Sequence, residues 1–326
     1  MVKTYAEAGV DIDASDEATA SLIAKIKGTN RKGNGEPIEL VNGFAGLVKL
    51  DDKALAVCTD GVGTKILLAE EMDSLHTVGI DCVAMNVNDL ICVGAEPISF
   101  VDYIALNEPN NEIMGKLGEG LAEGCRQANC TLSGGETAVV PELVYEFDIA
   151  GTAVGVVSKE KLIDGSKIAE GDVLIGIKSS GPHSNGYTLI RKIYNGNKEI
   201  GKKLVEPTKI YVKEIMNLLN EIEVSGIAHI TGGGLDNIPR MNDKFRYVID
   251  KPLPVQDVFE WLQKTGDIET KEMYRTFNMG MGMVVAVSEE CADSAERWLS
   301  ERLPGSRIVG RVVSNGRRVT HSDPEV

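Results

Sequence analysis

The chain contains no long hydrophobic run, and it has few basic residues for its number of acids. Nowhere do 18 apolar residues follow one another, and residues 1–25 lack the apolar core of a signal peptide. We therefore expect a cytoplasmic protein without a membrane segment. Lys and Arg number 34 against 49 Asp and Glu, which gives a formal net charge of −15. Because nucleic-acid binding needs clustered basic residues, we expect no nucleic-acid partner.

The six cysteines also lack the spacing of a metal or redox motif. No CxxC pair occurs, and most of the cysteines lie in apolar stretches of the sequence. This distribution favours reduced thiols in the core over structural disulfides or a zinc site.

The length of 326 residues is enough for about two domains. Strand and helix patterns alternate from residue 54 to 157, with strands at 54–60, 97–106, 130–133 and 144–157 and helices at about 75–93 and 110–128. A polar stretch follows. The second half predicts strands at 172–178, 245–250, 281–288 and 306–313, and helices at about 184–195, 208–222, 255–264 and 289–302. We predict an α/β domain over 1–165 and an α+β domain over 166–326.

Residues 1–50 form no clear element in this prediction. The stretch from Lys25 to Gly35 has too many glycines and charges for a stable helix. It is either a solvated loop or a mobile basic flap that closes over phosphates, and composition alone leaves both open.

The segment Thr59-Asp-Gly-Val-Gly-Thr-Lys65 directly follows an apolar strand. An acid at a strand end is suited to a divalent cation, glycines allow a polyanion to approach the backbone, and a lysine can pair with phosphate. The spacing fits neither a Walker P-loop nor a dinucleotide fingerprint. A phosphate site and an ordinary tight turn both remain open.

The helix at 78–93 has an apolar stripe, and its other side carries Asp81, Asn88 and Asp89. Residues 78–93 contain neither Lys nor Glu, which a solvated helix face would normally carry. Short carboxylates and amides are poor helix formers, so they indicate oxygen ligands for Mg²⁺. The alternative is a helix whose polar groups are hydrogen-bonded in the core.

Three glycine-rich segments follow. Ser133-Gly-Gly-Glu-Thr137 is expected to end a short strand, and its acid is expected to converge with Asp60 at one sheet edge. Ser179-Ser-Gly-Pro-His-Ser-Asn-Gly-Tyr187 and His229-Ile-Thr-Gly-Gly-Gly234 each resemble an anion cradle, although either could be a plain glycine turn.

Together these motifs resemble the phosphoribosylformylglycinamidine cyclo-ligase (aminoimidazole ribonucleotide synthetase) family of purine biosynthesis. The ordered matches also include the segments 5–13, 79–90, 94–97 and 272–278. The resemblance implies a ligase that uses ATP and Mg²⁺ to close the imidazole ring of formylglycinamidine ribonucleotide, with release of ADP and phosphate. A K⁺ requirement stays open.

The resemblance also implies site residues and an assembly. Lys27, Asp60, Asp89 and His183 are the implied catalytic residues. The implied metal ligands are Asp60, Asp89, Glu136 and Asp81. ATP or substrate would contact Lys27, Gly61, Gly63, Thr64, Lys65, Glu136, Ser184 and Asn185. The expected assembly is a homodimer in which the N-terminal domains of two copies share a barrel.

Two other classes compete with this interpretation. One is a sibling enzyme such as selenophosphate synthetase or thiamine-monophosphate kinase. The first is expected to carry a cysteine in its N-terminal flap, whereas no cysteine precedes Cys58 here. The second lacks the Gly-Pro-His-Ser-Asn-Gly loop. The other class is a catalytically silent nucleotide sensor, which would not require the full set of acids.

Overall fold

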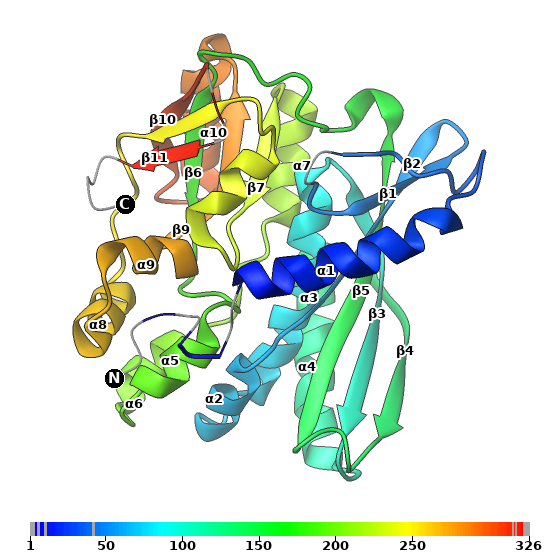
Figure 1. Ribbon diagram of the computed structural model, residues 1–326, viewed down its shortest axis with the longest axis vertical. Coiled ribbons are helices and arrows are strands. Elements are labelled where there is room, and N and C mark those ends of the chain that lie inside the picture. Colours follow the sequence, from blue (N-terminus) through cyan, green and yellow to red (C-terminus); the bar gives the residue numbers. More distant parts are fainter. Residues whose placement is uncertain are drawn as a thin grey trace.

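The computed structural model describes residues 4, 7–9, 12–40, 43–314, 316 and 318–321. Two sheets organise the chain (Figure 1). The first has the strand order β1-β2-β5-β3-β4 and the second the order β11-β8-β10-β6-β9-β7. The predicted two-domain α/β and α+β architecture is therefore confirmed. None of the helices within the described ranges has the length and apolar character needed to cross a membrane.

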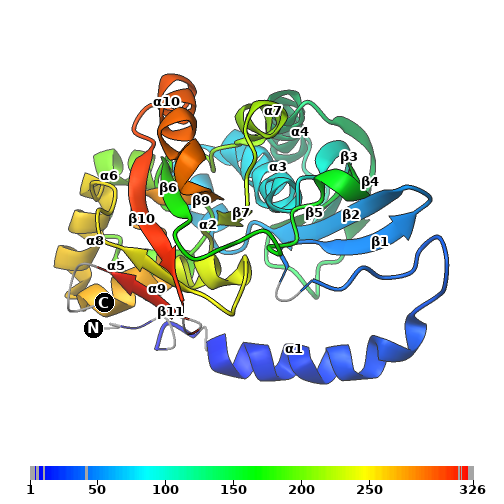
Figure 2. The same ribbon diagram turned by 90° about the horizontal axis from the view of Figure 1, so that it is seen from above.

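The first sheet and its helices come from the first half of the chain. Its strands are β1 (Gly46–Leu50), β2 (Lys53–Gly61), β3 (Glu96–Leu106), β4 (Thr131–Val139) and β5 (Phe147–Ser158). Its helices are α1 (Ile12–Ile26), η1 (Lys27–Thr29), α2 (Lys65–Glu71), α3 (Leu75–Cys92), α4 (Asn111–Ala128) and η2 (Lys159–Lys161). Helices α3 and α4 cover one face of this sheet and leave the other face without a helix layer (Figures 1 and 2).

The second sheet is built by the rest of the chain. Its strands are β6 (Val173–Lys178), β7 (Gly226–His229), β8 (Arg246–Ile249), β9 (Met281–Val287), β10 (Arg307–Val313) and β11 (Arg318–His321). The helices are α5 (Tyr187–Ile193), α6 (Lys198–Leu204), α7 (Val212–Glu221), η3 (Gly234–Arg240), α8 (Asp257–Gly266), α9 (Thr270–Thr276), η4 (Glu289–Cys291) and α10 (Ala292–Arg302). Strand β9 is buried along its whole length, as its unbroken apolar sequence requires.

Helix α3 is the centre of the molecule, because it packs on the first sheet, on α4 and on the second domain. Glycines allow the close approach of α3 to α4. A Cβ on Gly120 would lie 1.9 Å from the carbonyl oxygen of His76, and one on Gly79 would lie 2.4 Å from the amide nitrogen of Leu121. A side chain at either position would separate the two helices.

The structure corrects two sequence-based expectations about the elements. Residues 12–26 form the helix α1, which lies along the outside of the molecule (Figure 2). This stretch is rich in alanine and in apolar residues with good helix propensity, and it contains no glycine. Strand β4 is also longer than predicted, so Gly134, Gly135 and Glu136 lie inside a strand and not at its end.

The second glycine of the pair inside β4, Gly135, has a packing reason. A Cβ on Gly135 would lie 2.5 Å from Oδ1 of Asp102 on the neighbouring strand. The sheet register also shifts between Phe100 and Val101, next to this pair. Glycine in a strand interior typically marks such a bulge or close approach.

The prediction for the cysteines is confirmed. All six are free thiols, and Cys58, Cys82, Cys92 and Cys125 are buried.

Candidate active site between the domains

The end of strand β2 presents Asp60 at the boundary of the two domains. The carboxylate Oδ1 accepts a hydrogen bond from the amide of Gly61 at 2.8 Å. Thr59 anchors the same strand end, since its hydroxyl donates to the carbonyl of Gly151 at 2.8 Å. Gly63 has a φ of 67°, which lets the chain turn sharply from β2 into α2.

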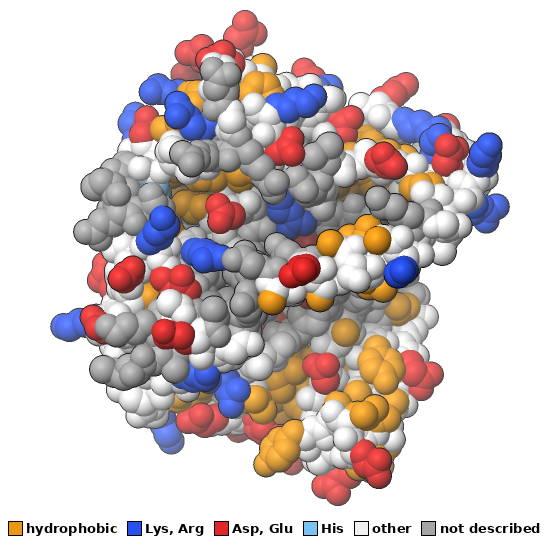
Figure 3. Space-filling view, in the orientation of Figure 1, with side chains coloured by type: hydrophobic (Ala, Val, Ile, Leu, Met, Phe, Trp, Pro, Cys, Tyr) orange, Lys and Arg blue, Asp and Glu red, His pale blue; other side chains and the backbone are white. Residues whose placement is uncertain are grey.

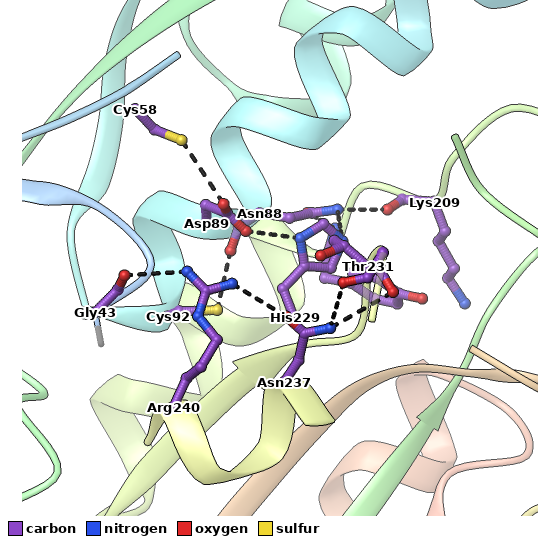
Figure 4. Close-up of polar contacts among 12 residues, drawn as sticks. Gly43, Cys58, Asn88, Asp89, Cys92, Lys209, His229, Thr231, Asn237 and Arg240 are labelled. Atoms are coloured by element: carbon purple, nitrogen blue, oxygen red, sulfur yellow. Dashed lines mark hydrogen bonds and ion pairs between the residues drawn. The ribbon is translucent and has the colours of Figure 1, made fainter. Parts of the chain in front are cut away.

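Asp89 on α3 faces His229, which ends strand β7 of the other domain (Figure 4). Its Oδ1 lies 2.8 Å from Nδ1 of His229. The imidazole is fully buried, while the Asp89 side chain is 16% exposed. The thiol of Cys58 donates to Oδ2 at 3.7 Å, and burial raises the pKa of that thiol far above its usual range, so the proton stays on sulfur.

The neighbouring Asn88 fixes the tautomer of His229. The Oδ1 atom of Asn88 accepts from the Tyr211 amide at 3.1 Å, and its Nδ2 donates to the Lys209 carbonyl at 2.8 Å. The Nδ2 atom therefore also points at Nε2 of His229, 3.5 Å away, and this ring nitrogen acts as the acceptor. The ring proton then resides on Nδ1, where it is donated to Asp89.

Asp60 and Asp89 influence each other electrostatically. The pKa of Asp60 is raised, mainly because its surroundings desolvate the carboxylate and also because Asp89 adds like charge nearby. The Gly61 amide and His229 oppose this rise. Two acids from β2 and α3 thus lie close enough for their charges to interact.

The chemistry of this pair is compatible with Mg²⁺. In the part of the chain that the structure describes, no group of three or more His, Cys, Asp or Glu side chains could hold a metal ion. Magnesium, however, is usually bound by one or two carboxylates together with substrate phosphates and water. The partly accessible Asp89, oriented by His229, and the neighbouring Asp60 are the donors that such a site requires.

The structure contradicts the predicted roles of Lys65 and Asp81. Both side chains are fully buried. The Lys65 ammonium lies 2.8 Å from Oδ2 of Asp81 and donates to Oδ1 at 2.9 Å. It also donates to the carbonyls of His183 and Glu206, each at 2.8 Å. All three N–H donors are therefore used inside the protein, and neither a phosphate nor a metal ion reaches this pair.

Glu136 does not join Asp60 within one chain. Asp60 pairs with Gly151, which pairs with Asp102, which in turn pairs with Gly135. Directly paired residues share a sheet face, so Glu136, the next residue along β4, points to the opposite face. Three strand spacings also separate β2 from β4, about 14 Å. The expected convergence of the two acids at one edge is therefore wrong for a single chain.

The loop 179–186 lies at the domain boundary, where Lys65 of the first domain donates to the carbonyl of His183. His183 is fully buried, with a ring centroid 6.3 Å from that of His229. Its Nε2 accepts from the Ser180 amide at 3.3 Å. Burial, reinforced by the neighbouring His229, lowers the pKa of His183 well below its usual range, so the ring is neutral and carries its proton on Nδ1.

The remaining predicted site residues line the same boundary. Ser184 lies 3.0 Å from the hydroxyl of Thr208, and Thr64 lies 3.1 Å from that of Thr188. Asn185 lies beside the 229–234 segment, since a Cβ on Gly232 would be 3.2 Å from its Oδ1. Lys27 begins η1, and its side chain lies outside the part of the chain that is described.

Sequence reasoning gave His229 no role of its own, and it missed Arg240. Arg240 donates to Asn237 at 3.0 Å and to the carbonyl of Gly43 at 3.1 Å, and it lies 4.0 Å above the Phe44 ring (Figure 4). It therefore ties the segment before β1 to the second domain. The His229-Ile-Thr-Gly-Gly-Gly motif was the available signal for His229. No local pattern pointed to Arg240, because its partners Gly43 and Phe44 lie almost 200 residues earlier in the sequence.

Two family descriptions match this chain and together cover most of it. "AIR synthase related protein, N-terminal domain" matches residues 43–157, and "AIR synthase related protein, C-terminal domain" matches residues 169–322. These matches and the two sheets define the class to which the chain belongs.

Curated relatives narrow the class. The phosphoribosylformylglycinamidine cyclo-ligase of Methanosarcina acetivorans is 46% identical over 97% of this chain and 96% of its own length. The enzyme of that name from Thermococcus kodakarensis is 47% identical over 95% of both chains. The chain therefore belongs to the phosphoribosylformylglycinamidine cyclo-ligase family.

A solved structure with the same fold is more distant in sequence. AaThiL complexed with AMPPCP and TMP has a TM-score of 0.68 and 14% identity, over 94% of this chain and 93% of its own. This similarity supports the fold alone.

Proposed function

We propose that this protein is a phosphoribosylformylglycinamidine cyclo-ligase that converts formylglycinamidine ribonucleotide to aminoimidazole ribonucleotide with ATP. The observation that carries this proposal is the near full-length identity of 46–47% to enzymes of that name. The juxtaposition of Asp60 and Asp89 at the domain boundary supports it, because phosphoryl transfer depends on positioning and charge neutralisation.

In the proposed reaction, ATP phosphorylates the formyl amide oxygen of the substrate. The amidine nitrogen then attacks that carbon, the ring closes, and phosphate leaves. Phosphorylation converts a poor leaving oxygen into a good one. A Mg²⁺ ion held by Asp60 and Asp89 would neutralise phosphate charge.

The chain's own residues supply orientation and proton handling. His229 donates from Nδ1 to Asp89 and thereby holds that carboxylate in place. Neutral His183 presents Nδ1–H, which has no hydrogen-bond partner among the described groups, and we assign it to a substrate or phosphate oxygen. Ser184 and Asn185 on the same loop, and Gly61, Gly63 and Thr64 after β2, complete the proposed site. Lys27 is proposed to reach the ATP phosphates from the segment after α1.

The cofactor proposal is ATP with Mg²⁺. The AaThiL structure, whose fold this chain shares, contains AMPPCP, an ATP analogue. A K⁺ requirement is a separate question, which an assay with and without K⁺ answers directly.

We also propose that the enzyme is a homodimer. Val57, Val101 and Tyr103 expose 37%, 37% and 47% of their surface on the face of the first sheet that has no helix layer. Hydrophobic side chains gather over this part of the molecule (Figure 3). A monomeric soluble protein rarely leaves such an area open. Glu136 lies on the same face, so dimerisation would bring it close to a second chain. A mass measurement by light scattering tests this assembly.

The function is tested by incubating the purified protein with formylglycinamidine ribonucleotide, ATP and Mg²⁺. We expect release of ADP and formation of aminoimidazole ribonucleotide in equal amounts. Thiamine monophosphate serves as the control substrate, and we expect no ADP from it. Absence of product from the ribonucleotide at saturating Mg²⁺ would contradict the proposal.

A further inference from the structure

A buried ion pair connects the two domains behind the candidate site. Lys65 and Asp81 both belong to the first domain, on α2 and α3, and both side chains are completely shielded from solvent. Their remaining hydrogen bonds all lead to the second domain. Lys65 donates to the backbone carbonyls of His183 and Glu206, which lie on two different loops.

Asp81 binds one of these two loops through its carboxylate. Its Oδ1 accepts from the backbone amide of Thr208 at 2.7 Å and from the Thr208 hydroxyl at 2.6 Å. That hydroxyl has one proton, and it is given to Asp81. Ser184 must therefore donate its own hydroxyl proton to Thr208, over 3.0 Å. The chain of contacts from Asp81 thus returns to the loop that holds His183.

Fold stability alone gives a weak reason for such a pair. Removing two charges from water costs about as much as their attraction returns, and apolar residues of the same volume often stabilise a protein as well or better. A buried ion pair does, however, fix geometry through the hydrogen bonds that it makes, because a buried donor or acceptor that loses its partner is costly.

The loop that these contacts hold is strained. His183 has a φ of 62°, in the left-handed region that residues other than glycine seldom adopt. Gly186 at the end of the same loop has a φ of 77°, and a Cβ there would lie 2.3 Å from the ring of Phe277. Backbone strain of this kind persists only where the surroundings hold it. The Lys65 ammonium contacts the strained residue itself, at the carbonyl of His183.

We propose that Lys65 and Asp81 form an interdomain clamp that holds the 181–186 loop in its active conformation, so that both act as positioning residues. The proposal rests on the assignment of that loop to the active site under the proposed function. The clamp holds the backbone of His183 through its carbonyl, while the buried imidazole packs near Tyr211 and His229.

The test is the double variant Lys65→Met with Asp81→Asn. It removes both charges at nearly unchanged volume, so neither partner is left as an isolated buried charge. The amide oxygen of the new side chain at position 81 can still accept from the Thr208 amide. We expect a folded variant with a lowered melting temperature, because the carbonyls of His183 and Glu206 lose their donor. We also expect a fall in kcat of about 10²-fold, since small displacements of positioned groups have effects of this size.

A second readout does not depend on turnover. Amide hydrogen exchange of the peptide spanning 181–186 should accelerate in the double variant, while peptides from β6 and β9 should keep their protection. If the double variant folds poorly, Thr208→Val gives the same information. It removes only the hydroxyl link between Asp81 and Ser184, and we expect faster exchange of the loop and a smaller fall in kcat.

The matched control is Lys167→Met with Glu223→Leu. This ion pair has a contact of 2.7 Å, close to the 2.8 Å of the Lys65–Asp81 pair, but its side chains are 58% and 71% exposed. We expect unchanged kcat and exchange. The proposal fails if the double variant at positions 65 and 81 folds and keeps the kcat of the wild type. It also fails if the amides of the 181–186 loop exchange as slowly in this variant as in the wild type. An inactive wild-type enzyme would instead contradict the proposed function, and loop exchange would still test the clamp.

Discussion

Two aspartates on the same helix have opposite surroundings. Asp81 is sealed between the domains, with Lys65 as its counter-charge and Thr208 as its hydrogen-bond donor. Among the described residues, Asp89, two turns further along α3, keeps part of its exposure and has hydrogen-bond contacts with His229 and Cys58. A carboxylate without a compensating cation can bind one, whereas a carboxylate already neutralised cannot. We therefore assign chemistry to Asp89 and structure to Asp81.

The largest expected effect comes from Asp89→Asn. This change removes a charge at unchanged shape, so the fold should stay intact while kcat falls by about 10²–10³-fold, as for other lost electrostatic contacts at reacting centres. Steady-state ADP release measures kcat, and circular dichroism checks the fold. Near-normal turnover would mean that this face of the helix is structural at both positions.

Asp81→Asn should show the reverse pattern. The substitution leaves the Lys65 ammonium buried without its counter-charge, a situation that typically costs about 3–5 kcal/mol of unfolding free energy. Urea denaturation of this variant beside Asp89→Asn measures the contrast directly. Equal stability of the two variants would remove the distinction between these residues.

His229→Phe tests how Asp89 is oriented. The ring keeps its bulk but loses the Nδ1 donor, and loss of such an orienting partner typically weakens metal affinity or activity by about 10–100-fold. The Mg²⁺ concentration that gives half-maximal turnover should rise accordingly. His229→Asn is the control, because its amide can replace the donor and should recover part of the affinity.

The raised pKa of Asp60 predicts that replacing this carboxylate by a neutral side chain stabilises the protein by an amount that depends on pH. Below the ordinary pKa of aspartate the group is protonated in both folded and unfolded chains. As pH rises above that value, Asp60 ionises in the unfolded chain before it ionises in the folded chain. The unfolding free energy therefore falls between the ordinary pKa of aspartate and the raised pKa of folded Asp60. Asp60→Asn should therefore melt higher than the wild type at pH 7, and this excess should shrink as pH falls toward 4. A melting temperature below that of the wild type at pH 7 would contradict this assignment.

The smallest effect is expected at an exposed ion pair. Lys116 donates to Asp73 at 2.8 Å and to Glu112 at 2.9 Å on the outer surface. Lys116→Met should change the unfolding free energy by less than about 1 kcal/mol, because solvent screens such pairs. A loss as large as that of Asp81→Asn would show that burial does not explain the behaviour of the Lys65 pair.

Local patterns predicted most of the fold, because alternating apolar residues and helix periodicity are recorded within short segments. They failed for α1, where neighbouring glycines and charges obscured a good helical stretch, and for β4, where glycines inside a strand were interpreted as its end. The structure of β4 depends on contacts with a distant part of the chain, the strand β3, which a short stretch of sequence does not contain.

The site shows the same division. The proximity of Asp60 and Asp89 fits their residue types and their positions at a strand end and on a helix face, while their role in metal binding stays a prediction. The roles of Lys65 and Asp81 could not be recognised, because their partners at 183, 206 and 208 follow more than 100 residues later. Only the packing of the second domain against α3 decides which acid is sealed and which stays accessible.

The most direct measurement is calorimetric titration of the wild type, Asp81→Asn and Asp89→Asn with AMPPCP at several Mg²⁺ concentrations. If Asp89 is the metal acid, Asp89→Asn will lose the Mg²⁺-dependent part of the affinity, while Asp81→Asn, at a temperature where it is folded, will retain that dependence. Retention by Asp89→Asn together with loss by Asp81→Asn would contradict the account.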